Sequence, residues 1–425
     1  MKKIVLATAL LLATALAARA WLWPADDAGA PAAPGTLNQQ QLVARGAYLA
    51  RAGNCMTCHT VRGGAAYAGG ALLQTPFGAV AAPNITSDRQ HGIGDWSGDD
   101  FWRALHNGKS RDGRLLYPAF PYTSYTRVRR EDSDALYAYL QSVPANNRPN
   151  TPHALRFPYN TQLALAAWRA LYFRPGVYQG DPRHSVEWNR GAYLVQGLGH
   201  CSACHSSRNA LGGSDGALTG GMIPMLGWYA PSLVTNDEAA LGDWPVTQIV
   251  QLLQTGVSPR GNTTGPMAAV VRQSLQYLDN TDMQAMAVYL KHLPASAGTV
   301  ARQPLPAPSA AVKAQLALGE KLYDKHCASC HQADGGGAPA AYPPLAGNRA
   351  VTTTSAVNAI RAILNGGFAP ATAGNPRPYG MPPFSHALND AEVAAVATYI
   401  RASWGNHAPE VSALEVNRYR NVPLE

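Results

Sequence analysis

The sequence CMTCH occupies residues 55–59. The same pattern, Cys-x-x-Cys-His, returns as CSACH at 201–205 and CASCH at 327–331, and the three copies contain all six cysteines. Positions i, i+3 and i+4 of a helix share one face, so the cysteines and histidine of each copy can contact one flat group. Two thiols with this spacing can bond to the two vinyl groups of one porphyrin, and the adjacent imidazole can bind its iron. Each copy therefore predicts one covalently bound haem.

Two other uses of paired cysteines fit the sequence less well. Zinc would require four ligands with a second pair at finger spacing, whereas these pairs lie more than a hundred residues apart. A redox dithiol would not explain why a histidine closes all three copies. We therefore expect three haem c groups. The attaching cysteines are Cys55, Cys58, Cys201, Cys204, Cys327 and Cys330, and the proximal iron ligands are His59, His205 and His331.

The composition describes a globular chain with many turns. Hydrophobic residues make up 46% of the 425 residues, whereas 40 residues are glycine, 32 are proline and only 14% are charged. Such a length suits about three ordinary domains, in agreement with three motifs. We expect short helices joined by loops, with a bulky cofactor completing each core.

The basic charge balance does not indicate nucleic-acid binding. The formal net charge is +8, and without the three basic residues of the first twenty it falls to +5, from 31 basic and 26 acidic residues. Six haem propionates would more than offset this excess. Apart from Arg127, Arg129 and Arg130 the arginines are scattered, and a short basic cluster is usually a solvated face. We expect no nucleic-acid partner.

Residues 1–20 have the pattern of an export signal. Lys2 and Lys3 precede an apolar run of 15 residues, and the small residues at 18 and 20, in Ala-Arg-Ala, suit cleavage. The run is shorter than the ~20 residues that cross a bilayer. We expect cleavage near Ala20, with an uncleaved anchor as the alternative. Either way we place the exported chain on the periplasmic side of the cytoplasmic membrane.

A repeat of about a hundred residues begins near Asn38. The segment RGAYLARAGNCMTCH is similar to RGAYLVQGLGHCSACH and, more loosely, to LGEKLYDKHCASCH. Downstream, Pro-Asn-Ile-Thr at 83–86 corresponds to Pro-Ser-Leu-Val-Thr at 231–235, and Gly-Asp-Trp occurs at 94–96 and 242–244. Internal similarity of this length predicts three copies of one domain. The expected boundaries are 38–150, 183–294 and 312–405.

Each copy is expected to contain two apolar helices after its motif. The first ends at glycine, the residue favoured after a helix C-terminus, and the second closes the copy. The first kind is expected at 101–108, 249–256 and 360–367, and the second at 134–144, 283–294 and 391–404.

Three segments lie outside the copies. Residues 151–182 form a connector rich in aromatic residues and proline, with a short helix expected at 162–172. Residues 295–311 have the composition of a semi-rigid linker. The C-terminal tail is expected to dock on its own domain through Leu414 and Val416.

A haem iron with one histidine has a second axial position, which a methionine often fills in small c-type domains. Met381 follows the first cysteine of the third copy by 54 residues, and Met267 follows that of the second by 66. A methionine that only filled a core gap would not explain the proline beside each one. We expect Met267 and Met381 to be distal ligands.

The first copy departs from this pattern. Its equivalent slot, 65 residues after the first cysteine, holds Phe120, which cannot bind iron. Three arrangements remain open: a five-coordinate iron, a histidine ligand, or a methionine lent by the second copy. The favoured expectation is an open or weakly ligated iron, with His106 a surface residue. The candidate ligands are His91, His106, Met222 and Met225.

Longer segments carry a family resemblance. Besides the three motifs these are the two Gly-Asp-Trp segments, YPAFPYTSYT at 117–126, MPPF at 381–384 and AVATYIRASWGN at 395–406. With them the chain resembles the three-haem cytochrome c subunits of bacterial membrane-bound dehydrogenases over nearly all of 38–405. The resemblance implies an all-α fold of three tandem class I cytochrome c-like domains, each built around one covalent haem.

The resemblance also implies partners. Similar chains accompany quinoprotein alcohol dehydrogenases, flavin-dependent gluconate, sorbitol or fructose dehydrogenases, or molybdenum-containing aldehyde and N-heterocycle dehydrogenases. They work at the membrane surface and pass electrons to ubiquinone or a terminal oxidase.

The residues themselves indicate electron relay. The sequence has no dinucleotide fingerprint, phosphate loop or exposed nucleophile with its base. Three redox centres in one chain therefore indicate one-electron transfer. Two alternatives remain: a haem enzyme acting at an open first iron, and a free periplasmic carrier.

Overall fold

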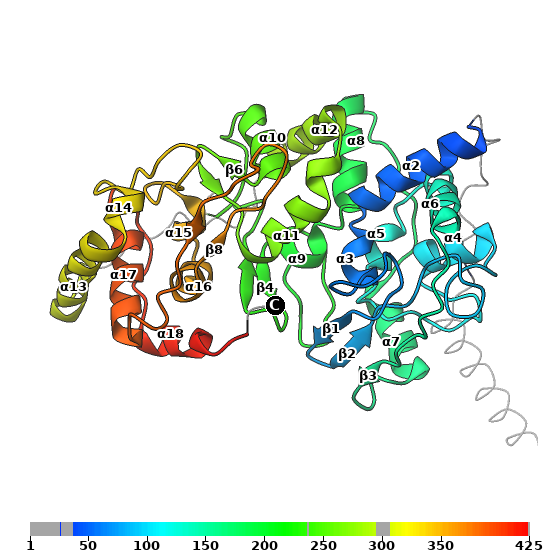
Figure 1. Cartoon of the computed structure of the whole chain (residues 1–425), viewed down its shortest axis with the longest axis horizontal. Helices are drawn as coiled ribbons and strands as arrows, with labels where there is room; N and C mark the ends of the chain where they lie inside the picture. Colours follow the sequence, from blue (N-terminus) through cyan, green and yellow to red (C-terminus); the bar gives the residue numbers. More distant parts are fainter. Residues whose placement is uncertain (1–25, 27–36, 236–237, 295–306, 424–425) are drawn as a thin grey trace, which may run out of the picture. The chain divides into compact units, whose positions relative to one another are not determined.

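The computed structural model describes residue 26 and residues 37–235, 238–294 and 307–423 (Figure 1). The predicted export signal and most of the predicted linker at 295–311 lie outside these residues. Among the helices of the described ranges, none combines the length and the apolar character needed to cross a bilayer.

The chain divides into two compact units, the first of which contains the first repeat. This unit comprises the described residues up to Gly180 together with 196–200 and 208–215. Its three strands form one antiparallel sheet in the order β1-β2-β3. The elements are α2 (Gln39–Ala52), α3 (Cys55–His59), β1 (Leu72–Thr75), β2 (Gly78–Ala81), α4 (Gly98–Asn107), α5 (Tyr122–Tyr125), α6 (Arg130–Ser142), β3 (Ala154–Leu155) and α7 (Gln162–Tyr172).

The second unit contains most of the second repeat and the described part of the third repeat. It comprises 181–195, 201–207 and the described residues from Gly216 onward. The first half of its elements are α8 (Val186–Gln196), α9 (Ser202–His205), β4 (Gly221–Ile223), β5 (Trp228–Ala230), α10 (Val246–Thr255), β6 (Val257–Ser258), β7 (Gly261–Asn262), α11 (Gly265–Gln273), the 3-10 helix η1 (Leu275–Tyr277) and α12 (Asn280–Lys291).

The remaining elements of the second unit belong to the third repeat. They are α13 (Ala310–His326), α14 (Ala328–His331), α15 (Arg349–Thr352), α16 (Val357–Asn365), β8 (Gly367–Phe368), β9 (Gly380–Met381), α17 (Asp390–Ala402) and α18 (Ala413–Arg420). The strands of this unit are short antiparallel pairs, β4 with β5, β6 with β7 and β8 with β9. The fold is therefore largely helical, as predicted, while its division into three domains stays a prediction.

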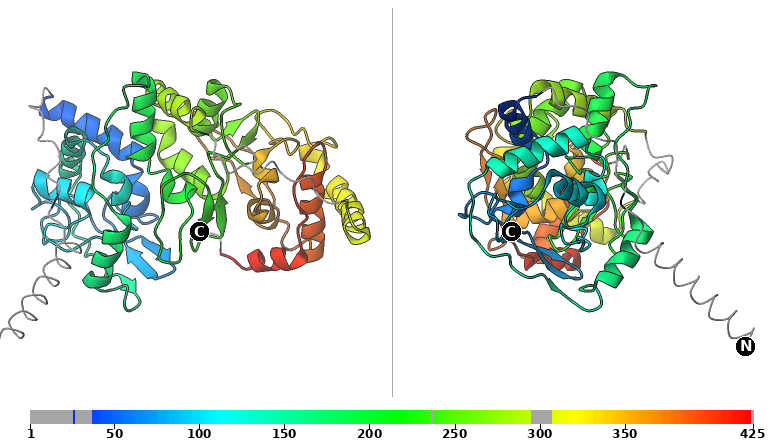
Figure 2. Two further views of the ribbon diagram at one scale, coloured as in Figure 1. Left: turned by 180° about the vertical axis from the view of Figure 1, so that it is seen from behind. Right: turned by 90° about the vertical axis from the view of Figure 1, so that its right-hand side faces the viewer.

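Each repeat brings its first and last helices into close contact at a glycine. The pairs are α2 with α6, α8 with α12 and α13 with α17 (Figure 1 and Figure 2). A Cβ atom added at Gly46, Gly191 or Gly319 would lie 1.9, 1.9 or 2.2 Å from the carbonyl oxygen of Ala135, Ala285 or Ala395, respectively. No side chain fits such a gap, so glycine is what lets the two backbones meet.

An ion pair accompanies this crossing in two of the repeats. Arg45 Nε donates to Asp132 at 2.7 Å in the first, and Arg190 Nε donates to Asp282 at 2.7 Å in the second. Both aspartates are buried, so each charge is compensated where water is excluded. The third repeat has Leu318 at the arginine position, and its crossing relies on apolar packing.

Both helices predicted after each motif are present, and a glycine follows the first of the two as expected. In the described chain α4, α10 and α16 match the first kind, and α6, α12 and α17 match the second. Gly108 and Gly256 follow α4 and α10 with φ values of 58° and 80°, in the left-handed region that suits glycine. Gly366 follows α16 with a φ of 62°.

The connector helix α7 has the predicted bounds. Thr161 begins it, since its side chain accepts a hydrogen bond from the Ala164 amide. Leu165 and Ala166 on its inner face pack with Leu115 in a small buried cluster. The connector therefore folds as part of the first unit.

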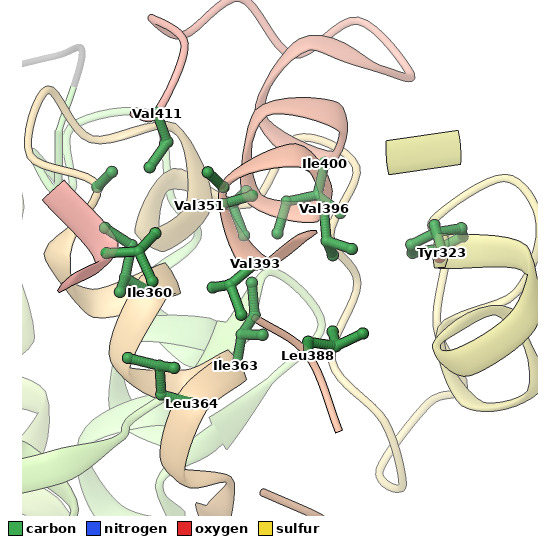
Figure 3. Packing of buried hydrophobic residues seen from close by; sticks show 14 residues of the cluster. Tyr323, Val351, Ile360, Ile363, Leu364, Leu388, Val393, Val396, Ile400 and Val411 are labelled. Atoms are coloured by element: carbon green, nitrogen blue, oxygen red, sulfur yellow. The ribbon is translucent and has the colours of Figure 1, made fainter. Parts of the chain in front are cut away.

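A hydrophobic cluster fills the third repeat between α16 and α17 (Figure 3). Val416 of α18 is fully buried in it, so the predicted docking of the tail on its own domain is confirmed for this residue. The same prediction is wrong for Leu414, which is 64% exposed. Residues two apart point to nearly opposite sides of a helix, and α18 presents only one side to the core.

We predict that Gly46→Ala destabilises the first unit by about 2–3 kcal/mol, because the new methyl group must displace the α6 backbone. Denaturant unfolding followed by circular dichroism would measure the change. Gly176→Ala is the matched control, since a methyl group there meets nothing within 4 Å. Equal losses for the two variants would contradict the close-crossing explanation.

Candidate functional site

Each Cys-x-x-Cys-His motif lies on a short helix close after the first helix of its repeat. The motif helices are α3, α9 and α14, and each ends at its histidine. No two cysteines of the described chain form a disulfide. In every copy the helical turn places both thiols and the imidazole on one side, as the spacing predicts.

Burial keeps the leading thiol of each motif protonated. It raises the pKa of Cys55 and of Cys201 to about 12 and that of Cys327 to about 11, with a further contribution from the second cysteine of the same motif. The thiols of these three leading cysteines are therefore neutral and poor nucleophiles in the polypeptide itself.

A backbone carbonyl orients each motif histidine. The Nδ1 atoms of His59, His205 and His331 lie 2.7, 2.8 and 3.0 Å from the carbonyl oxygens of Pro83, Pro231 and Pro343, respectively. A carbonyl only accepts, so each Nδ1 donates and the neutral ring carries its lone pair on Nε2. This is the arrangement that orients an imidazole as a metal ligand.

The protonation state of the histidines agrees with that arrangement. Burial lowers the pKa of His59, His205 and His331, while the hydrogen bond to the proline carbonyl opposes the shift. Each ring is therefore neutral at pH 7. Two thiols and one neutral, oriented imidazole at each of three places fit a covalently attached haem with a histidine on its iron.

The proline carbonyls are functional groups that the motif alone does not reveal. Two of them had a sequence signal, because Pro83 and Pro231 begin the segments that recur between the first two repeats. Pro343 lies in a different sequence, AYPPL, and had none. Only the folded structure shows that all three carbonyls accept a hydrogen bond from a motif histidine.

The two methionines proposed as distal ligands lie in different local structures. Met267 lies in the first turn of α11, and Met381 lies in β9, opposite Gly367. Both are half-buried, and Met381 packs against the hydrophobic cluster of the third repeat. Their assignment as ligands stays a prediction.

Aromatic side chains surround the slot that holds Phe120. The Phe120 ring lies 5.4 Å from that of Tyr125, and the Tyr125 hydroxyl donates to the Gly53 carbonyl at 3.1 Å. Burial raises the pKa of Tyr125 well above its usual value, and its electrostatic interaction with Cys55 and Cys58 adds to the shift. Tyr125 therefore lies beside the first motif, a position that sequence reasoning missed.

The expectation that His106 is a surface residue is wrong. Its side chain is fully buried, stacks on Trp102 at 4.5 Å, and places Nδ1 2.8 Å from the Thr126 carbonyl oxygen. The reason is that the face of α4 that carries His106 packs against α5. The position of a residue near the end of a helix does not show which way its side chain points.

The other candidates for the first iron lie in exposed or half-buried places. His91 is half-buried in a turn where its amide donates to Asp88. Met222 and Met225 belong to the second unit and are 44% and 58% exposed. Whether any of them serves the first motif stays open.

Comparison with known proteins identifies the family of the chain. The sequence profile of the cytochrome c family matches residues 43–144 and 316–404. The alcohol dehydrogenase (quinone) cytochrome c subunit of Gluconacetobacter polyoxogenes is 38% identical over 90% of this chain and 84% of its own length. The gluconate 2-dehydrogenase cytochrome c subunit of Pantoea cypripedii is 39% identical, with 86% of each chain covered.

A third relative is longer. A nicotinate dehydrogenase subunit of Pseudomonas putida is 40% identical over 94% of this chain, which spans only 33% of that protein. A largely helical fold with the cytochrome c profile and these motifs defines a c-type cytochrome, which binds haem covalently. More closely, the chain belongs to the family of cytochrome c subunits of dehydrogenases.

We predict that Tyr125→Phe lowers the free energy of unfolding by about 1 kcal/mol, because it removes a buried hydrogen bond to Gly53. Denaturant titration of the purified chain would measure the loss. Tyr159→Phe, at a tyrosine that is 38% exposed, should leave stability nearly unchanged. If both variants behave alike, the hydroxyl of Tyr125 contributes nothing specific.

Proposed function

We propose that this chain is an electron-transfer subunit that carries three haem c groups and relays electrons from a dehydrogenase to ubiquinone or a terminal oxidase. The observation that carries the proposal is the threefold contact between a motif histidine and a proline carbonyl. Each contact fixes a neutral imidazole beside two thiols, which is the combination that a covalently attached haem needs from the chain.

The residues that would hold each group follow from the motifs. When bound, haem c supplies reversible one-electron oxidation and reduction at its iron. The chain attaches the groups through its cysteine pairs, orients the proximal imidazoles and keeps them neutral by burial. The proposed ligands are His59 for the first haem, His205 with Met267 for the second, and His331 with Met381 for the third.

We assign the three haems to three tandem class I cytochrome c-like domains, at 38–150, 183–294 and 312–405. The recurrent crossing at Gly46, Gly191 and Gly319 supports this division, since each crossing precedes a motif. Most of the second domain shares one compact unit with the third.

The names of the relatives indicate the class of partner. Cytochrome c subunits of alcohol and gluconate dehydrogenases work with a dehydrogenase, so a dehydrogenase partner follows from the family. We propose that it is a larger subunit of the quinoprotein, flavoprotein or molybdenum type, and that the complex sits at the membrane surface on the periplasmic side. The chain itself then needs no substrate site.

We predict that mild detergent extraction of membranes yields this chain together with a larger dehydrogenase subunit, at three haem c groups per cytochrome chain. Mass spectrometry and a haem assay on the same material would measure both. Recovery of the chain alone from the soluble fraction would instead favour a free carrier.

A matched variant tests the number of haems independently of the dehydrogenase partner. Cys201→Ala with Cys204→Ala removes both attachment points of one site, so the haem content should fall from three to two per chain. An unchanged content would contradict the assignment of the second motif.

Phe120 favours a second function for the first site. A side chain that cannot bind iron occupies the methionine slot beside Tyr125, so the first haem is proposed to keep an open position for a small ligand. A haem enzyme acting at this site is the alternative to a pure relay.

We predict that the reduced protein binds carbon monoxide at one of its haems and that Phe120→Met abolishes this binding. The thioether would fill the open position and raise the reduction potential of that haem. Carbon monoxide difference spectra and potentiometry would measure the two effects. Phe157→Met, at a side chain that is 81% exposed, is the control. Absence of binding in the parent protein would exclude the open site.

A further inference from the structure

Trp228 occupies a buried position next to the proposed distal side of the second haem. Its side chain is 9% exposed and belongs to β5. A Cβ atom added at Gly265 would lie 2.7–2.9 Å from three atoms of the indole ring, so the ring packs directly on the backbone there. Gly265 begins α11 and precedes Met267, the proposed ligand, by two residues.

The Trp228 ring also contacts the third repeat. The guanidinium carbon of Arg361, on α16, lies 4.9 Å from the ring centroid, within the range of a cation–π interaction. The Arg361 side chain is fully buried, and its Nη2 donates to the Pro423 carbonyl at 3.1 Å. Both repeats therefore hold the indole in one place.

A neighbouring residue of α16 fixes the strand that carries Trp228. The Tyr229 amide donates to Asn358 Oδ1 at 3.0 Å, and Asn358 Nδ2 donates to the Tyr229 carbonyl at 2.7 Å. Asn358 and Arg361 are three residues apart, so they lie on the same face of the helix. The Asn358 side chain thus makes the same pair of hydrogen bonds with the β5 backbone that a neighbouring strand would make.

The same strand is tied to the proximal side of the second site. The Tyr229 hydroxyl donates to the buried Glu238 carboxylate at 2.8 Å, and the Ser232 amide donates to the same group at 2.6 Å. Ser232 directly follows Pro231, whose carbonyl accepts from His205. Trp228 is therefore held relative to both sides of that site.

The helix α16 continues the contact to the third site. It ends at Asn365, and a Cβ atom added at the next residue, Gly366, would lie 2.2 Å from the Met381 carbonyl oxygen. Met381 also packs on the hydrophobic cluster to which Ile360 and Leu364 of α16 belong. A series of contacts therefore runs from Gly265, two residues before Met267, through Trp228 and α16 to Met381.

We propose that Trp228 mediates electron transfer between the second and third haem sites, with Arg361 and Asn358 as its positioning residues. The inference rests on the proposed function, because it requires a haem at both sites. Delocalised π orbitals couple two redox centres more strongly than saturated side chains do over the same gap. With both haems bound, one electron would pass from one to the other, and Trp228 would itself be neither oxidised nor reduced, so the transfer needs no further reactant.

The test uses the full chain with its haems attached. After flash reduction by an external photoreductant, the rate of electron equilibration between the second and third haems is measured, together with all reduction potentials. Trp228→Leu should slow this phase several-fold with the potentials unchanged. Trp228→Phe, which keeps an aromatic ring, should restore most of the rate.

Two further variants separate positioning from general damage. Asn358→Ala keeps the indole but removes its clamp, and should slow the phase to an intermediate degree. Trp188→Leu removes a tryptophan of the second repeat outside this contact series and should change nothing. In a Cys55→Ala, Cys58→Ala background only the second and third haems remain, which assigns the phase to that pair.

The outcomes distinguish the inference from the proposed function. An unchanged rate in a Trp228→Leu chain that still contains all its haems would overturn the role of Trp228 alone. A purified parent chain that lacks the second or third haem would overturn the proposed function, and the inference with it.

Discussion

The close approach of two helix backbones at a glycine is the contact on which the rest of each repeat depends. It brings the first and last helices together at Gly46, Gly191 and Gly319. Because each motif follows its first helix within a few residues, this crossing fixes where the two thiols and the imidazole lie. The loop that supplies the proline carbonyl can then reach the histidine. A side chain larger than hydrogen at the crossing would move every later part of the site.

Burial gives the sites their chemistry. It raises the pKa of the leading thiols and lowers the pKa of the motif histidines, so both kinds of group are neutral in the folded chain. A neutral imidazole with its Nδ1 hydrogen bonded is ready to bind iron through Nε2. The buried Asp282 carboxylate, by contrast, is paired with an adjacent guanidinium, that of Arg190.

The second and third repeats are joined by side chains that belong to neither motif. Asn358 and Arg361 lie one helical turn apart on α16 and hold Tyr229 and Trp228 of the second repeat. The same helix packs beneath Met381. Contacts of this kind join the third repeat to the part of the second repeat that lies in the same compact unit.

The local sequence was enough to predict the motifs, the repeat, the helices that end at Gly108 and Gly256 and the connector helix α7, because spacing and helix-stop residues act over a few positions. It could not place His106 or Leu414 correctly, nor find Tyr125, Pro343 or the contact of Trp228 with Arg361. Burial and contacts between distant residues depend on which face of each helix meets the core. The sequence by itself thus determined the residue types of the proposed attachment sites. Only the tertiary structure decided which carbonyls, rings and helices surround them, since those neighbours are brought together by packing across a hundred residues or more.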